Sequence, residues 1–282
     1  MFVTLQAPLF HLVTAFALFA CPLVGARQAM LGRADRFSAA RFCSAVEAER
    51  VSVTNVASAQ VALVAASPAA SARDLSSLRL VSCGGAPLDA AALRAVVSRC
   101  GCPFFHEYGC TEAGGKITVA LPSPSLSAAV GCDEKSGAQV APTAPAELER
   151  RLAFAGSAGR PFAGVTVRLL KPGVGGGCGG DDAAAFVPVP APGSVSAAGE
   201  VVVRGVSVIP RYFSRAGGGV TATDDDGAGC FVDGFFRTGD VGVWDATSCD
   251  ASTLVLLDRV KDTSARASLS SRLALPPLIS GF

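Results

Sequence analysis

The stretch from Tyr108 to Glu112 constrains this chain most, because it brings an aromatic ring, a glycine, a hydroxyl and a carboxylate together in five residues. Tyr108 offers a flat face on which a base can stack, and Gly109 lets the backbone approach a ligand closely. Thr111 can donate a hydrogen bond to a phosphate or carboxylate oxygen, and Glu112 is a hard oxygen ligand suited to Mg²⁺. This combination indicates a nucleotide site rather than an ordinary turn.

The residues before this stretch predict an α/β sheet. Apolar runs over Leu75–Val81 and Pro103–Tyr108 are typical of buried strands, and Asp89–Cys100 between them is typical of a helix that Asp89 caps. Open α/β sheets bind ligands outside the carboxyl ends of their strands. We therefore expect Tyr108–Glu112, which follows the second strand, to lie at a binding edge.

Further short motifs accompany this stretch in a fixed order, and they are Ser82–Leu88, Gly156–Pro161, Gly199–Gly205, Asp233–Asp240 and Asp258–Asp262. With Tyr-Gly-x-Thr-Glu, they resemble the signature motifs of the adenylate-forming superfamily, which includes acyl-CoA synthetases, luciferases and adenylation domains. One pentapeptide is a weak signal, whereas six motifs in the family's order are specific. The resemblance covers roughly residues 3–262.

The resemblance implies a partial adenylate-forming N-terminal domain of the α/β class. We expect an α/β sheet subdomain over residues 1–168, a small β-rich, barrel-like subdomain over 169–262, and a tail unlike the family over 263–282. Segments rich in Gly, Pro, Ser or Ala interrupt this pattern and are expected to be flexible surface loops. These segments are Leu121–Glu149, Pro172–Gly199 and Ala216–Cys230.

The reaction that the resemblance implies has two steps and three substrates. A carboxylic acid, fatty or otherwise, would attack the α-phosphorus of ATP with Mg²⁺ present, giving an acyl-adenylate and pyrophosphate. The thiol of coenzyme A would then displace AMP. The chain is thus expected to be an AMP-binding acid–thiol ligase of the acyl-CoA synthetase type.

The resemblance also assigns the residues around the nucleotide. Gly84, Gly85 and Ala86 would line the adenine pocket, and Tyr108 would stack on the base with Gly109 beside it. From the residues alone, the first three also fit an ordinary strand-to-helix turn, and Tyr108 fits a half-buried core residue.

Further roles concern the phosphate, the ribose and the acid. Thr111 would bind the α-phosphate and Glu112 would hold Mg²⁺, although a helix N-cap with an acid in the first turn is an alternative. His11 would lie near the acyl carboxylate, or it is a core histidine. Asp240 and Arg259 would reach the ribose. Lys261 matches the hinge about which the family's C-terminal domain swings.

Two family features have no counterpart in the chain. The Ser/Thr/Gly-rich phosphate loop, which ends in Pro-Lys-Gly, should precede the Pro8–His11 turn, and the C-terminal domain with its lysine should follow Asp262. We therefore expect the chain to be an internal piece of a longer enzyme. The alternative is a catalytically dead remnant that binds a nucleotide or a protein partner.

The N-terminal residues allow another hypothesis. Residues 1–26 carry no charged side chain, and Val24–Ala26 resembles a signal-peptidase site, so a secreted or membrane-anchored protein is an alternative. The family register instead favours a buried strand and helix in a cytoplasmic or organellar enzyme that does not bind membranes. The net charge of +1 over 282 residues gives no reason to expect nucleic acid as a partner. Ten cysteines without a Cys-x-x-Cys pair predict reduced, mostly buried thiols rather than a zinc site.

Overall fold

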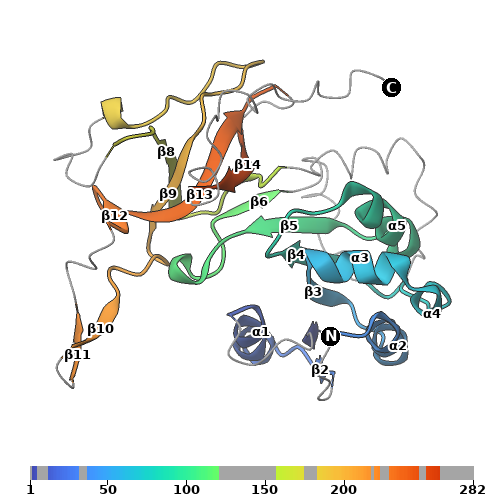
Figure 1. Cartoon of the computed structure of the whole chain (residues 1–282). Helices are drawn as coiled ribbons and strands as arrows, with labels where there is room; N and C mark the ends of the chain where they lie inside the picture. Colours follow the sequence, from blue (N-terminus) through green and yellow to red (C-terminus); the bar gives the residue numbers. More distant parts are fainter. Residues whose placement is uncertain are drawn as a thin grey trace. The chain divides into compact units, whose positions relative to one another are not determined.

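The computed structural model describes residues 2–4, 12–31, 37–120, 157–174, 183–216, 219–222, 229–247 and 252–260. The chain divides into two compact units, Met1–Val165 with Gly205–Ile209, and Thr166–Arg204 with Pro210–Phe282. Each unit is built around its own sheet (Figure 1). The subdomain limits at residues 168 and 262 stay a prediction.

The first unit contains a mixed sheet whose described strands run in the order β2-β1-β3-β4-β5-β6-β7. Strands β1 to β5 pair in parallel, and β6 and β7 add to the edge antiparallel. The strand order reverses between β1 and β3, which is the kind of position where α/β sheets open a binding crevice. The strands are β1 (Phe2–Thr4), β2 (Gln28–Met30), β3 (Val53–Ala57), β4 (Leu80–Gly84), β5 (Phe104–Tyr108), β6 (Thr118–Ala120) and β7 (Arg160–Pro161).

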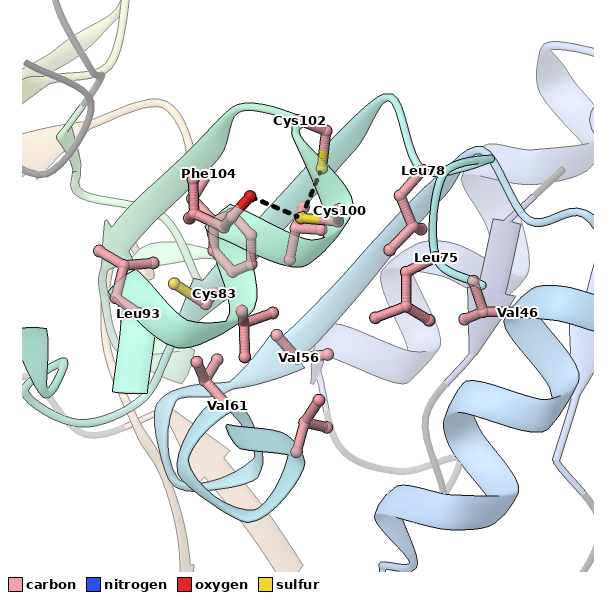
Figure 2. Packing of buried hydrophobic residues seen from close by; sticks show 14 of the residues in the cluster. Val46, Val56, Val61, Leu75, Leu78, Cys83, Leu93, Cys100, Cys102 and Phe104 are labelled. Atoms are coloured by element: carbon pink, nitrogen blue, oxygen red, sulfur yellow. Dashed lines mark hydrogen bonds between the residues drawn. The ribbon is translucent and has the colours of Figure 1, made fainter. Parts of the chain in front are cut away.

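The helices of this unit are α1 (Leu12–Leu23), α2 (Ala39–Glu49), α3 (Ser58–Ala66), α4 (Pro68–Ser71) and α5 (Ala90–Cys100). Side chains of α2 to α5 pack with those of β3 to β6 in one apolar core, part of which Figure 2 shows. Leu93 on α5 and Val61 on α3 are among its fully buried members. The predicted cap of α5 is confirmed, because the Asp89 carboxylate accepts from the backbone N–H of Ala92 at 2.7 Å.

Some element boundaries differ from the sequence-based expectation. The strand predicted over Leu75–Val81 begins only at Leu80. Leu75 and Leu78 are buried all the same, because a turn closed by the Leu78 N–H and the Leu75 carbonyl points both into the core. An apolar run therefore marks buried residues correctly here but not their conformation.

Helix α1 is less buried than expected. Its buried face carries Thr14, Ala17 and Cys21, whereas Phe16 and Phe19 are exposed on the other face. None of the helices in the described ranges combines the length and the apolar character needed to cross a bilayer.

The second unit contains an antiparallel sheet in the order β12-β13-β9-β8, and β14 also pairs with β13. A separate hairpin joins β10 (Phe213–Ala216) to β11 (Gly219–Ala222). The barrel-like shape implied by the resemblance stays a prediction. The sheet strands are β8 (Val165–Leu170), β9 (Gly199–Gly205), β12 (Phe231–Val232), β13 (Phe235–Asp245) and β14 (Thr253–Arg259).

Two of the segments expected to be flexible surface loops contain ordered structure, and the prediction is wrong for those parts. Within Pro172–Gly199, Ala185 and Phe186 are buried in the core of the second unit, and the Phe186 ring lies 5.6 Å from that of Phe235. Within Ala216–Cys230, residues 219–222 form β11. The third segment, Leu121–Glu149, lies outside the described residues.

Candidate active site

The turn that follows β4 is fixed by backbone geometry. Gly84 lies opposite Glu107 of β5, and a Cβ atom added to Gly84 would come within 2.5 Å of the Glu107 carbonyl oxygen. Gly85 has a φ of 84°, in the left-handed region that favours glycine. Both glycines are therefore required by local structure, whatever they bind.

Ser58, at the start of α3, stabilises this turn through its hydroxyl group. Its hydroxyl lies within hydrogen-bond distance of two carbonyl oxygens, 2.7 Å from that of Ala86 and 3.3 Å from that of Gly84. Ser58 itself is buried. Sequence reasoning missed this residue, because its partners are backbone atoms of a distant segment.

His106, on β5, joins two of the sequence motifs. Its Nε2 lies 3.2 Å from the Ala86 carbonyl oxygen, and its Nδ1 lies 3.2 Å from the Ser157 carbonyl oxygen. Carbonyl oxygens only accept hydrogen bonds, so a neutral ring donates to one of them and a protonated ring to both. The imidazole is buried and ties the strand that carries Tyr108 to the segments on both sides of it. No role was predicted for His106. A histidine inside an otherwise apolar strand could nevertheless have indicated a buried side chain that needs hydrogen-bond partners.

The segment from Tyr108 to Glu112 follows β5 directly. A Cβ atom on Gly109 would lie 2.2 Å from the Gly115 carbonyl oxygen, so the chain can fold back here only with glycine. Thr111 begins a single 3₁₀ turn, and its side chain is exposed. The N-cap alternative for Thr111 is wrong, because the cap position is Cys110.

Glu112 is held through its backbone. Its carbonyl oxygen accepts from the Ile209 N–H at 2.8 Å, and the residue is half-buried. Within the described ranges, no group of three or more His, Cys, Asp or Glu side chains is placed to hold a metal ion. A single half-buried carboxylate nevertheless fits Mg²⁺, which commonly takes one or two protein carboxylates and completes its shell with water and phosphate oxygens.

A charged pair lies close to this segment. Lys116 Nζ is 2.6 Å from Glu107 Oε1, and the same ammonium lies 5.3 Å from the centre of the Phe16 ring on α1.

Two cysteines lie near the same strand. Burial, reinforced by the charge of Glu107, raises the pKa of the Cys83 thiol to about 12. Burial also raises the pKa of the Cys110 thiol to about 11. Both thiols are therefore neutral at physiological pH.

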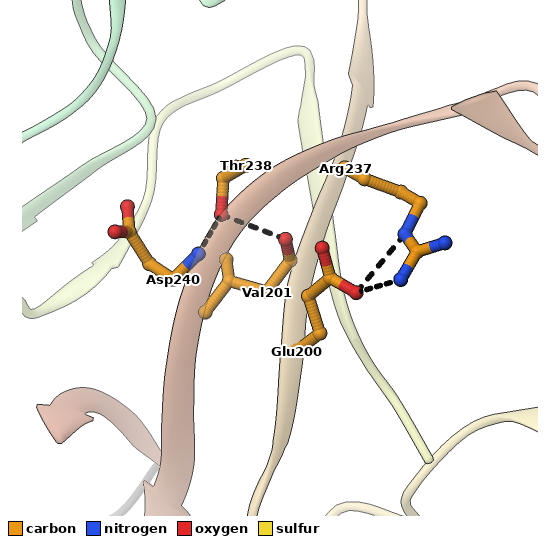
Figure 3. A network of polar contacts seen from close by, with 5 residues as sticks. All are labelled: Glu200, Val201, Arg237, Thr238 and Asp240. Atoms are coloured by element: carbon orange, nitrogen blue, oxygen red, sulfur yellow. Dashed lines mark hydrogen bonds and ion pairs between the residues drawn. The ribbon is translucent and has the colours of Figure 1, made fainter. Parts of the chain in front are cut away.

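The second unit positions Asp240 through an irregularity in its sheet. Between Arg237 and Val241 the register of β13 against β9 shifts, and Gly239 within this bulge has a φ of 73°. Bulges of this kind re-aim side chains next to functional sites. Thr238 fixes the bulge, since its hydroxyl donates to the Val201 carbonyl at 2.8 Å and accepts from the Asp240 N–H at 3.1 Å (Figure 3).

Arg237 and Glu200 support the same bulge from the neighbouring strand. Arg237 Nε donates to Glu200 Oε2 at 3.0 Å, so an ion pair links β13 to β9 just before the shift in register (Figure 3). Both side chains belong to sequence motifs, Glu200 to Gly199–Gly205 and Arg237 to Asp233–Asp240, but neither had a predicted role. They stabilise the strand pair that presents Asp240.

The predicted site residues are thus distributed over both units. Gly84, Gly85 and Ala86 lie beside the strand that ends in Tyr108, all within the first unit. Asp240 and Arg259 face each other in the second unit. The predicted residues His11 and Lys261 lie outside the described residues.

Comparison with known proteins agrees with the motifs. Residues 2–213 match the model of the family described as AMP-binding enzyme. Feruloyl-CoA synthase from Amycolatopsis sp is 31% identical over 257 residues, which are 91% of this chain and 40% of that protein. Indoleacetate–CoA ligase from Aromatoleum aromaticum is 29% identical over 207 residues, which are 73% of this chain and 31% of that protein. The chain thus spans well under half the length of these relatives.

Solved structures share the fold. The N-terminal domain of FACL13 from Mycobacterium tuberculosis superposes with a TM-score of 0.61 at 22% identity, covering 92% of this chain and 50% of that one. The amide bond synthetase McbA from Marinactinospora thermotolerans also gives 0.61, at 25% identity, covering 92% of this chain and 41% of that one. With the family match over residues 2–213, these likenesses lead to one conclusion: the chain belongs to the family of AMP-binding enzymes.

Proposed function

We propose that this chain is the AMP-binding part of an ATP-dependent acid–thiol ligase, which converts a carboxylic acid into an acyl-adenylate and then into a coenzyme A thioester. The observation that supports this most is the position of His106, which contacts the carbonyls of Ala86 and Ser157 and so joins two motifs of the family to the strand that ends in Tyr108. The carboxyl ends of β4 and β5, which His106 fixes in place, suit a flat ligand that forms hydrogen bonds, such as adenine.

The proposed roles at the nucleotide follow from where each group lies. The turn Gly84–Ala86 and Gly109 let backbone atoms approach the base, on which Tyr108 stacks. The exposed hydroxyl of Thr111 donates to the α-phosphate. Asp240 accepts hydrogen bonds from the ribose hydroxyls, and Arg259 orients that carboxylate.

Three further groups complete the proposal. Glu112 holds Mg²⁺, which neutralises phosphate charge when it is bound. His11 lies at the acyl carboxylate, and Lys261 is the hinge for a domain beyond the described residues. In this scheme residues 1–168 bind base, phosphate and acid, and residues 169–262 bind the ribose. The chemistry then requires two displacements, the acid carboxylate on the α-phosphorus with pyrophosphate leaving, and the coenzyme A thiol on the acyl carbon with AMP leaving.

An aromatic carboxylic acid is the acyl substrate that we favour. Relatives that match the chain are named for feruloyl-CoA, 4-coumarate and indoleacetate, all of which carry an aromatic ring. The exposed face of α1 offers the rings of Phe16 and Phe19, and the Lys116 ammonium lies over Phe16. Aromatic rings gain from stacking on such a surface.

The nucleotide site is tested by titrating AMP into the 282-residue chain in a calorimeter. Loss of a base–aromatic stack costs about 1–3 kcal/mol, so Tyr108→Ala should weaken AMP binding about 5- to 150-fold. Tyr212→Ala is a matched control, because Tyr212 is the chain's other tyrosine and packs on Phe236 in the second unit. Equal affinities for the wild type and Tyr108→Ala would contradict the adenine site.

The ligase step is tested separately, in a longer protein that joins this chain to a phosphate loop and a C-terminal domain, by ATP–pyrophosphate exchange with ferulic, 4-coumaric, indoleacetic and long-chain fatty acids. Exchange with the aromatic acids alone supports the proposal, and exchange only with fatty acids overturns the acyl class. AMP binding with no exchange for any acid supports the alternative, a nucleotide-binding remnant. The two experiments therefore separate recognition of the nucleotide from catalysis.

A further inference from the structure

Two cysteine thiols lie in contact where α5 turns into β5. Cys100 is the last residue of α5, and Cys102 stands two residues before β5 begins. Their sulfur atoms are 3.4 Å apart, with the Cys102 thiol donating to the Cys100 sulfur (Figure 2). Neither belongs to the nucleotide site described above.

The residue between them makes the approach possible. Gly101 caps α5 with a φ of 64° and a ψ of 5°, and its N–H donates to the Val97 carbonyl at 2.9 Å. Glycine adopts this left-handed conformation without strain, so the chain reverses at once and both side chains turn toward the same core. A disulfide bond is about 2.05 Å long, so the two sulfurs need to move together by only about 1.4 Å.

Two other buried thiols of this unit have different surroundings. The Cys83 thiol donates to the Phe105 carbonyl at 3.3 Å, and Cys43 lies beside the Arg99 guanidinium. The pKa of each of these thiols is raised by burial. In contrast, the hydrogen bond from Cys102 lowers the pKa of Cys100, which favours its thiolate. Thiolates are the form that attacks disulfides.

We propose that Cys100 and Cys102 form a dithiol site that low-molecular-weight disulfides oxidise to an intramolecular disulfide. The Cys100 thiolate attacks one sulfur of the small disulfide and releases its other half as a thiolate, leaving a mixed disulfide on Cys100. The Cys102 thiol, on losing its proton, attacks the Cys100 sulfur and releases the second half. The protein loses two protons and two electrons, and the small disulfide takes them up to become two thiols.

Because both thiols are buried, the attack of Cys100 on the small disulfide requires a local opening of the structure. Cys100 is 3% exposed and Cys102 is 2% exposed, so the oxidant reaches them when the last turn of α5 opens. Helix ends open more readily than helix centres, and the Gly101 N–H closes this one by donating to the Val97 carbonyl. Once the mixed disulfide forms, the neighbouring thiol is already in place. This proximity favours the intramolecular bond over a stable adduct.

The test uses the folded, reduced chain with oxidised glutathione, followed by denaturation and alkylation with N-ethylmaleimide. Cleavage after Arg99 and after Glu107 isolates residues 100–107, which contain Cys100 and Cys102 but not Cys110. We expect this peptide to lose two hydrogen atoms and to carry no maleimide. Tryptic peptides with Cys43 or Cys83 serve as internal controls, and the disulfide should form about tenfold faster than adducts on these thiols.

A variant traps the intermediate. In Cys102→Ser the resolving thiol is absent, so the peptide should carry one glutathione on Cys100 at a rate similar to that of disulfide formation in the wild type. If this variant does not fold, the wild-type peptide map decides alone. The proposal is overturned if residues 100–107 carry two maleimides under conditions that fully oxidise the denatured chain. Equal modification rates at Cys43, Cys83 and Cys100 would overturn it too.

Discussion

Arg259 Nε donates to Asp240 Oδ1 at 3.1 Å, and the two residues are direct partners in the pairing of β13 with β14. They are 19 positions apart and belong to different sequence motifs, yet the antiparallel register brings them together. The bulge at Gly239 turns Asp240 out of the regular ladder with β9. The carboxylate is thus held by its own sheet before any ligand arrives, which is the kind of preorganisation that binding sites use.

Because of this arrangement, we expect replacement of Asp240 to weaken AMP binding and replacement of Arg259 to change the stability of the fold only slightly. Asp240→Asn removes a charged acceptor, and hydrogen bonds to charged groups contribute about 1.5–3 kcal/mol, so AMP should bind about 10- to 150-fold more weakly. Arg259→Ala breaks an ion pair whose arginine side chain is 68% exposed, so the free energy of unfolding should change by less than about 1 kcal/mol. Calorimetry with AMP and urea unfolding measure the two effects. Asp245→Asn, on the same strand, is the control, and equal AMP affinity in both aspartate variants would refute the ribose role.

Part of this molecule was predictable from the sequence, because motifs and strand patterns are properties of consecutive residues. The run from β4 through α5 to β5, with Asp89 as the cap of α5, agrees with the sequence-based prediction apart from the start of β4. His106 and Ser58 were missed because their partners are backbone carbonyls 20 to 51 positions away. Any residue type presents a carbonyl, so such a partner leaves no signature in the sequence.

The segment Pro172–Gly199 was misjudged for a different reason. Its glycines and prolines predicted a flexible loop. That prediction rested on the average composition of the segment and overlooked the short apolar run that includes Ala185–Val187. So short a run carries no periodicity, but Ala185 and Phe186 lie in the core of the second unit with Leu170 and Phe235. Burial of a few large side chains therefore outweighed the average composition of the segment.

His106 should prove important for stability. His106→Ala removes a buried ring and its hydrogen bond to the Ala86 or Ser157 carbonyl, and one such hydrogen bond contributes about 0.5–1.5 kcal/mol. His106→Gln, whose amide can donate to one of these carbonyls, should recover part of the loss. Urea unfolding followed by circular dichroism measures both variants. If His106→Ala unfolds at the same urea concentration as the wild type, the bridging role is wrong.

Gly109 should tolerate no side chain. In Gly109→Ala the new Cβ would lie 2.2 Å from the Gly115 carbonyl oxygen, so the backbone that carries Tyr108 and Thr111 has to shift. We expect AMP binding to fall below detection, with a loss of stability of about 1–3 kcal/mol. Gly25→Ala is the control, because a Cβ atom there would meet nothing within 4 Å, and although its φ of 65° adds local strain, this variant should keep its AMP affinity. Normal AMP binding by Gly109→Ala would show that the segment adapts.

Phe186 should anchor the second unit. Phe186→Ala removes a buried ring that packs on Phe235, and such changes cost about 3–5 kcal/mol. Val189→Ala, three residues further on and 67% exposed, should change stability by less than about 0.5 kcal/mol. Trp244 is the chain's single tryptophan and is buried in this unit, so its fluorescence reports the unfolding of this unit specifically. Similar fluorescence transitions for the two variants would mean that the segment is a loose loop after all.

Glu47 should make the stability of the first unit depend on pH. Its carboxylate accepts from the Asp74 N–H at 2.9 Å and from Arg73 at 2.8 Å, and these two hydrogen bonds lower its pKa from the ordinary value of 4.5. A carboxyl whose pKa is lower in the folded chain stabilises the fold above its ordinary pKa, and this stabilisation disappears as the pH falls through the folded value. Glu47→Gln should therefore be less stable than the wild type at neutral pH, and the gap should close below about pH 4.5. Glu49→Gln removes a carboxylate from the same helix and controls for net charge, and circular dichroism follows the helices of this unit. Because the pair is partly exposed, salt should narrow the gap at neutral pH, whereas a gap of constant size throughout the acid range would contradict the role of Glu47.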